Sequence, residues 1–278
     1  AELVAGAMIV EFWFPHANTT LWAMGFFVLL LGLNWMTVKA YAEAEYWFAG
    51  IKVLTVIIFL AVGLLLIFGG MGDAPVGFHN WTLRDEATGR AAPFVNGLAG
   101  VLGVFMVAGF SFQGTEGVGL AAAETADPTR NVPRAIRSVF WRILLFYVGA
   151  IFVIGALVGF NNPDLLNGNE AHVAYSPFTM VFAKVPHIGY YAASLMNAVI
   201  LTAVLSCGNS AFYVSTRMLY AMACAGKAPR TFSIVSPRGV PVRALLATGV
   251  VGALAFFSSY VGDQKIYQLL YKIGRAHV

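Results

Sequence analysis

The sequence predicts an all-α integral membrane protein that crosses the bilayer several times. Of its 278 residues, 59% are hydrophobic and only 11% are charged, whereas soluble domains carry about 25% charged residues. The apolar residues form long runs, and a helix needs about 20 mainly apolar residues to span the hydrocarbon core. Basic residues gather in alternate connections between these runs, which indicates membrane topology rather than a surface for nucleic acid. We therefore expect a lipid bilayer, and not a nucleic acid, as a partner.

The first half of the chain contains four predicted spans, at residues 1–14 (the end of a helix), 20–38, 47–68 and 94–123. They are separated by a short loop, a charged turn and a long polar loop, at residues 15–19, 39–46 and 69–93. A continuous helix over residues 94–123 would extend about 45 Å, well beyond the roughly 30 Å hydrocarbon core. An interrupted or strongly tilted helix is therefore expected there.

The second half contains three further spans and the beginning of an eighth, at residues 140–160, 188–218 and 244–261 and from 266 onward. Their connections are a basic segment at 124–138, a polar loop at 161–187 with a short helix around 177–184, and a basic connection at 217–243. The more basic set of alternate connections faces the cytoplasm, and its members are Lys39, Lys52, Arg130, Arg134, Arg137, Arg142, Arg217, Lys227, Arg230, Arg238 and Arg243. Loops 69–93 and 161–187 are accordingly placed outside the cytoplasm.

Several chemistries find no support in the sequence. Cys207 and Cys224 would lie about 25 Å apart on one helix, which is too far for a disulfide. The histidines fall in loops or in the carboxyl-terminal tail, which disfavours membrane haem subunits and metal-dependent intramembrane enzymes. No nucleophile elbow or phosphate loop occurs either. We therefore expect no enzyme, no metal and no cofactor.

Both ends of the chain suggest a piece of a longer protein. Residues 1–6 already resemble the middle of a membrane helix, and no signal peptide precedes them. Residues 273–278, Ile-Gly-Arg-Ala-His-Val, match the translation of a common sequencing-adapter oligonucleotide. We expect residues 1–272 to form one transmembrane domain and residues 273–278 to be a translated adapter artefact.

Residues 109–116 form the main candidate site. Polar Ser111, Gln113 and Thr115 and two glycines come just before Glu116, in a run without charge from residue 91. Freed backbone groups at membrane depth survive only where they line a cavity. A carboxylate buried in lipid is costly and marks a functional site by default. We predict a broken helix around a small polar ligand; alternatively, Glu116 pairs with a lysine or with a neighbouring helix.

Other polar residues also fall at predicted membrane depth. Lys52 lies near the start of its span, seven residues after Glu45, and is either a proton-titrating amine or a lysine that snorkels to the surface. Glu2 precedes a long apolar run and is a candidate site residue. A further set on the sixth span forms either one stripe facing a cavity or separate interhelical hydrogen bonds: Asn197, Thr202, Ser206, Asn209 and Ser210.

Three groups of motifs follow in order along the chain. The first is AEYWF at 44–48, before Lys52. The second is FSFQGTE at 110–116, with AAAE at 121–124 and NVPRAI at 131–136. The third consists of the polar segments at 197–210 and 215–220. Together they resemble the amino acid permease family of the amino acid–polyamine–organocation superfamily, in particular its bacterial lysine-specific members. The resemblance covers nearly the whole chain up to the adapter-like tail.

The resemblance implies a fold of two inverted five-helix repeats with helices one and six broken. The present chain is then a fragment, from helix three to the start of helix ten, without helices one, two, eleven and twelve. The family's substrate contacts on helix six carry over to Phe110, Ser111, Phe112, Gly114, Thr115 and Glu116, and we count Glu2 and Asn209 with them. Lys52 matches the lysine of proton-coupled relatives. Cys207 departs mildly from the small residue expected at its position.

The implied function is import of an amino acid, expected to be lysine, coupled to protons across a bacterial inner membrane. Glu116 either neutralises a cationic substrate or carries the coupling proton. One alternative is a permease for an aromatic or neutral amino acid. Another is a sensor without transport, which binds a regulatory membrane partner at the 161–187 loop through Asp164 and Glu170.

Overall fold

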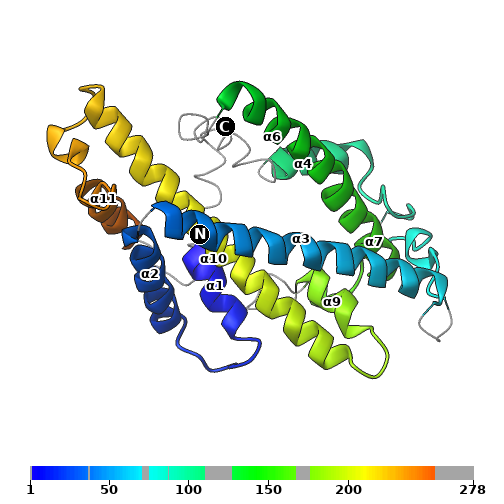
Figure 1. Cartoon of the computed structure of the whole chain (residues 1–278). Coiled ribbons are helices and arrows are strands. Elements are labelled where there is room, and N and C mark those ends of the chain that lie inside the picture. Colours follow the sequence, from blue (N-terminus) through cyan, green and yellow to red (C-terminus); the bar gives the residue numbers. More distant parts are fainter. Residues whose placement is uncertain are drawn as a thin grey trace. The chain divides into compact units, whose positions relative to one another are not determined.

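The computed structural model describes residues 2–36, 38–70, 75–86, 88–109, 127–166 and 176–253, in which the regular elements are helices (Figure 1). Extended pairing in this part of the chain amounts to a single antiparallel bridge between Arg84 and Ala91. The all-α prediction is therefore confirmed for these residues. The chain divides into two compact units. The first holds the described parts of residues 1–53 and 194–278, and the second those of residues 54–167 and 176–193.

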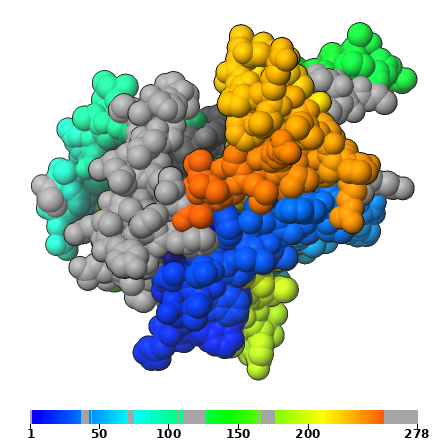
Figure 2. Space-filling model, turned by 90° about the vertical axis from the view of Figure 1, so that its left-hand side faces the viewer, coloured from blue at the N-terminus to red at the C-terminus, as the bar shows by residue number. Residues whose placement is uncertain are grey.

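The first unit is built from five helices: α1 (Glu2–Val10), α2 (Thr19–Trp35), α3 (Val38–Phe68), α10 (Gly189–Cys224) and α11 (Val242–Ala253). The later part of α3 and the first residues of α10 belong to the second unit. Its apolar core is formed by Leu3, Ala7, Val10, Ala23, Phe26, Leu30, Phe212, Val240 and Leu245. Every residue of α1 from Leu3 to Val10 is buried, as expected for a helix that is apolar all round. Figure 2 shows α11, in orange, lying on the blue α2. A Cβ on Gly249 of α11 would lie 3.1 Å from Leu31 Cδ2, so this glycine lets the two helices approach closely.

Local sequence explains where α2 begins. The Asn18 side chain accepts a hydrogen bond from the Leu21 amide at 3.2 Å, which satisfies one of the free amides of the first turn. Met36 is extended, and its amide bonds back to the Leu33 carbonyl. The segment predicted as the second span is thus an apolar helix, which ends at Trp35 rather than at Val38.

The predicted charged turn at residues 39–46 is wrong, because α3 runs without interruption for 31 residues from Val38 to Phe68. Residues 38–47 contain no glycine or proline and are rich in alanine and glutamate, which favour helix. The basic connection at 124–138 is likewise helical from Pro128 onward, in α6 (Pro128–Arg142). Proline is well suited to the first position of a helix, where its missing amide costs nothing. Charge in these segments marks helix ends outside the apolar core and not turns.

The second unit contains the later part of α3 together with shorter elements: η1 (His79–Trp81), α4 (Gly97–Ala108), α6, the π-helical turn η4 (Ile143–Val148), α7 (Gly149–Leu157), α8 (Pro163–Leu166) and α9 (Pro177–Ala183). Gly63 of α3 packs so tightly on α7 that a Cβ there would overlap Val153 Cγ1. Phe59 is fully buried, and its ring centroid lies 4.7 Å from that of Phe178 in α9. The short helix predicted around residues 177–184 is confirmed, with the Ser176 hydroxyl accepting from the Phe178 amide.

Three described helical segments are long and apolar enough to cross a membrane: Glu45–Phe68, Pro128–Leu157 and Gly189–Cys224. The apolar helices α2 and α11 are shorter, with 17 and 12 described residues. α10 continues beyond the predicted end at Met218 as far as Cys224. It therefore carries both cysteines on one helix, and both are free.

Residues 110–126 lie outside the described part of the chain. The interrupted helix predicted near 109–116, with all its proposed substrate contacts from Phe110 to Glu116, stays a prediction. The same holds for the end of the seventh span, for the start of the eighth, for the 273–278 tail and for Glu170 in the 161–187 loop.

Candidate functional site

Glu45 lies at the centre of a polar cluster in the first unit. Its two carboxylate oxygens each accept a hydrogen bond from α10: Ser206 Oγ donates to Oε2 at 2.8 Å, and Asn209 Nδ2 donates to Oε1 at 2.8 Å. Ser206 and Asn209 are three residues apart on the helix and share a face, and they are 1% and 0% exposed. A carboxylate near the start of a membrane span is thus held by two buried donors.

Lys52 joins this cluster from the same helix as Glu45. Its Nζ donates to Ser206 Oγ at 2.7 Å, so the Ser206 hydroxyl accepts from the ammonium and donates to the carboxylate. Lys52 is seven residues beyond Glu45, which is about 10 Å along a helix axis. The Ser206 hydroxyl of α10 therefore bridges the side chains of Lys52 and Glu45 on α3. Lys52 is partly buried in this contact, and both of its interpretations, a proton-titrating amine and a lysine that snorkels to the surface, stay predictions.

Asn34 extends the cluster to a third helix. Its Nδ2 donates to Asn209 Oδ1 at 2.8 Å and to the Leu30 carbonyl at 2.9 Å. Asn209 is therefore held on both sides, since its oxygen accepts from α2 and its nitrogen donates to Glu45. In this arrangement the Asn209 amide positions the Glu45 carboxylate.

Glu2 lies against the same part of α10. Cys207 Sγ donates to Glu2 Oε1 over 4.0 Å. At the next residue, a Cβ on Gly208 would lie 3.1 Å from Leu30 Cδ1 and 3.4 Å from Glu2 Cβ, so glycine here lets α1 and α2 pack closely on α10. The predicted site residues Glu2 and Lys52 thus contact α10 within one turn of Asn209, at Cys207 and Ser206 respectively.

The other polar residues of α10 do not continue a single stripe. Asn197 Nδ2 donates to the Ile9 carbonyl of α1 at 3.3 Å, and Thr202 Oγ1 donates to the Val199 carbonyl of its own helix at 2.8 Å. Nine residues separate Asn197 from Ser206, which places them on opposite sides of a helix at about 100° per residue. Asn197 thus makes an interhelical hydrogen bond, whereas the Thr202 bond lies within α10 and matches neither alternative.

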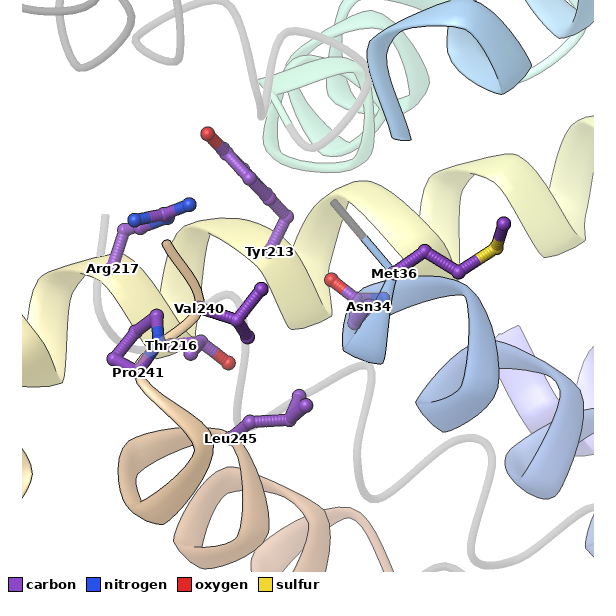
Figure 3. A pocket seen from close by; sticks show the side chains of 8 residues that line it. All are labelled: Asn34, Met36, Tyr213, Thr216, Arg217, Val240, Pro241 and Leu245. Atoms are coloured by element: carbon purple, nitrogen blue, oxygen red, sulfur yellow. The ribbon is translucent and has the colours of Figure 1, made fainter. Parts of the chain in front are cut away.

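A small pocket adjoins the cluster at the cytoplasmic end predicted for these helices (Figure 3). Its volume is about 10 Å³, and Asn34, Thr216, Val240 and Leu245 are among the residues that line it. Thr216 Oγ1 is buried and has no hydrogen-bond partner among the described residues. One water molecule fits a space of this size, whereas ligand pockets measure about 300–1,000 Å³. The pocket is therefore too small to hold an amino acid.

Sequence reasoning named Lys52 and Asn209 as site residues but missed Glu45 and Asn34. Glu45 was assigned to a turn, although its spacing of seven residues from Lys52 puts the two on one face of a helix. Asn34 is the single amide side chain in the apolar run of α2, and this could have marked it as a candidate site residue. Neither signal identifies the partner helix, which only the structure provides.

Comparisons with known proteins agree on one family. The family described as amino acid permease matches residues 1–275. The lysine-specific permease of Escherichia coli (strain K12) is 49% identical over 96% of this chain and 53% of its own length. The histidine permease of Lactococcus lactis is 44% identical over 97% of this chain and 54% of its own length. The γ-aminobutyric acid permease of Bacillus subtilis is 41% identical over 97% of this chain and 54% of its own length. The chain thus spans about half the length of the curated relatives it matches.

Proposed function

This chain belongs to the amino acid permease family, and from that premise we propose that the full-length protein imports lysine together with protons. The family and the apolar helices make the protein a multi-pass membrane protein. The relative from E. coli, a lysine-specific permease, supports lysine as the substrate and a bacterial inner membrane as the location.

The observation that carries the proton part of the proposal is the contact between Lys52 and Ser206. An amine inside a membrane-spanning segment is costly when charged, and so it is a natural group to gain and lose a proton. In this proposal, the charged ammonium of Lys52 holds α3 to α10 through its hydrogen bond to Ser206 Oγ. The neutral amine of Lys52 binds Ser206 less strongly, so the two helices separate more easily. Loss of the proton would then shift the equilibrium between outward-facing and inward-facing states.

The substrate part of the proposal rests on residues 110–116. Backbone groups exposed at a broken helix would bind the ends of the amino acid, with Phe110, Ser111, Phe112, Gly114 and Thr115 around it. Glu116 would neutralise the side-chain ammonium of lysine or take the coupling proton. Glu2 is retained as a further candidate contact, and Asn209 as a candidate that acts through Glu45.

Uptake of labelled lysine by the full-length protein in proteoliposomes tests the proposal. An inside-alkaline pH gradient should drive accumulation, and a protonophore should abolish it. Uptake that continues after the gradient collapses would contradict proton coupling. Full activity of Glu116→Gln would remove the role assigned to that residue.

Substrate choice needs its own measurement, because relatives with similar identity include a histidine permease and a γ-aminobutyric acid permease. Unlabelled amino acids at tenfold excess should compete in the order lysine, then arginine, with little effect of histidine or γ-aminobutyric acid. Stronger competition by histidine would replace lysine with histidine in the proposal and leave amino acid transport intact.

A further inference from the structure

We propose that Glu45 is a second proton site, and that the Ser206 hydroxyl passes the proton between Lys52 and Glu45. This inference rests on the proposed function of proton-coupled transport and adds to it a path for the proton. It assigns a proton-accepting role to Glu45, which the proposed function names only as the group through which Asn209 acts.

The direction of the hydrogen bonds marks Glu45 as the acceptor of the whole cluster. Lys52 donates to Ser206 at 2.7 Å, and Ser206 donates to Glu45 at 2.8 Å. From the other side, Asn34 donates to Asn209, and Asn209 donates to Glu45, each at 2.8 Å. Both chains of donors therefore end on the same carboxylate, one at Oε2 and one at Oε1.

The transfer itself balances at each atom. Lys52 Nζ gives a proton to Ser206 Oγ, and Ser206 releases its own hydroxyl proton to Glu45 Oε2. One N–H bond and one O–H bond break, and two O–H bonds form. Lys52 becomes a neutral amine, Glu45 becomes a neutral carboxylic acid, and the serine is unchanged. The distances of 2.7 and 2.8 Å suit both steps without rearrangement of the heavy atoms.

The transfer also changes what holds the two helices together. Before it, an ammonium and a carboxylate are bridged by a hydroxyl of α10, in charge-assisted hydrogen bonds that are stronger than neutral ones. After it, the two groups of α3 are neutral. A neutral pair is less costly to separate and desolvate at membrane depth than a charged pair. Proton transfer thereby loosens α3 from α10, which is the kind of event that coupling requires.

The charges around the pair are few in the described part of the chain. On α3 they are Lys52 and Glu45 themselves, and α10 contributes a titratable but uncharged group, the Cys207 thiol. α1 contributes Glu2, which Cys207 contacts. α2 contributes the uncharged amide of Asn34. Glu45 is the carboxylate bonded directly to the hydroxyl that Lys52 contacts, which makes it the partner for the transfer rather than Glu2.

The test uses the full-length protein in proteoliposomes and compares two activities. Accumulation of labelled lysine under a pH gradient, with the membrane potential clamped at zero, needs net proton movement. Exchange of labelled lysine for internal lysine does not. Ser206→Ala removes the relaying hydroxyl, Ser206→Thr keeps it, and Glu45→Gln cannot accept a proton. Thr202→Ala is the matched control, because it removes a hydroxyl of the same helix that bonds to its own backbone.

We expect Ser206→Ala and Glu45→Gln to lose at least tenfold in accumulation while exchange stays within threefold of the unmodified protein. Ser206→Thr and Thr202→Ala should stay within twofold in both activities. Ser206→Ala with unchanged accumulation overturns the relay. Equal loss of accumulation and exchange in Ser206→Ala, without rescue by threonine, assigns the cluster a structural role and also overturns it. An unmodified protein that exchanges lysine but ignores the gradient contradicts the coupling in the proposed function itself.

Discussion

Asn34 near the end of α2 donates a hydrogen bond to Asn209 of α10, with 2.8 Å between Nδ2 and Oδ1. Asn209 passes the connection on to Glu45 of α3. Both asparagines are buried, at 8% and 0% exposure. Three helices of the first unit are thus joined by consecutive side-chain amides that end on one carboxylate, and the stability of this arrangement can be measured one residue at a time.

Asn209→Leu should be strongly destabilising. The substitution removes the acceptor for one N–H of Asn34, which keeps its bond to the Leu30 carbonyl, and the donor to Glu45 Oε1. Each buried group left unpaired costs about 1–3 kcal/mol. We expect the free energy of unfolding to fall by about 2–4 kcal/mol, as measured by titration with sodium dodecyl sulfate in mixed micelles. A fall below about 0.5 kcal/mol would mean that the amides contribute little.

Asn197→Leu provides the contrast on the same helix. Asn197 is also 0% exposed, but its Nδ2 donates over 3.3 Å to the Ile9 carbonyl. Its buried Oδ1 has no hydrogen-bond partner among the described residues. Leucine removes one long hydrogen bond and one unpaired polar atom together, and these effects oppose each other. The free energy of unfolding should therefore change by less than about 1 kcal/mol in the same titration. A loss as large as that of Asn209→Leu would show that burial alone, and not pairing, sets the cost.

Gly63→Ala tests the packing of α3 on α7 in the second unit. A Cβ at this position would overlap Val153 Cγ1, and overpacking of this kind typically costs about 1–3 kcal/mol. Gly50→Ala is the matched control in the same helix, because a Cβ built there meets no atom within 4 Å beyond its chain neighbours and the nearby backbone of α3. The control should gain up to about 1 kcal/mol from helix propensity. Adding Val153→Ala should recover part of the loss at Gly63, and failure to recover any would contradict this explanation.

The sequence predicted the three described segments that are long enough to span a membrane but misplaced their ends, and the reason is visible in α3. Hydropathy marks where lipid surrounds a helix, whereas hydrogen bonding along the backbone decides where the helix itself begins. Residues 39–46 are polar and also good helix formers, so the helix extends beyond the apolar run. The same difference between hydropathy and backbone hydrogen bonding applies to two other helices. α6 begins at Pro128, before the predicted start at 140, and α10 ends at Cys224, after the predicted end at 218.

The candidate site shows a different limit. Lys52 and Asn209 were predicted because each is a polar residue in an apolar run. The pairing of Glu45 with Ser206 across two helices was not predictable, since the two residues are 161 positions apart and no local pattern links them. Side-chain partners on separate helices depend on helix packing, which periodicity in one segment cannot determine.

Lys184, which follows α9 in the second unit, allows a test by pH. Its Nζ donates to the carbonyl of Leu157 at the end of α7, and partial burial lowers the pKa of its ammonium below the ordinary value. The folded protein therefore releases this proton at a lower pH than the unfolded chain does, so unfolding takes up protons between the lowered pKa and about 10.4. The free energy of unfolding should rise with pH through that window. Lys184→Met should remove this rise, and Lys227→Met, at an exposed lysine in the connection after α10, should retain it. Equal pH dependence of the two variants between the lowered pKa and about 10.4 would contradict the assignment to Lys184.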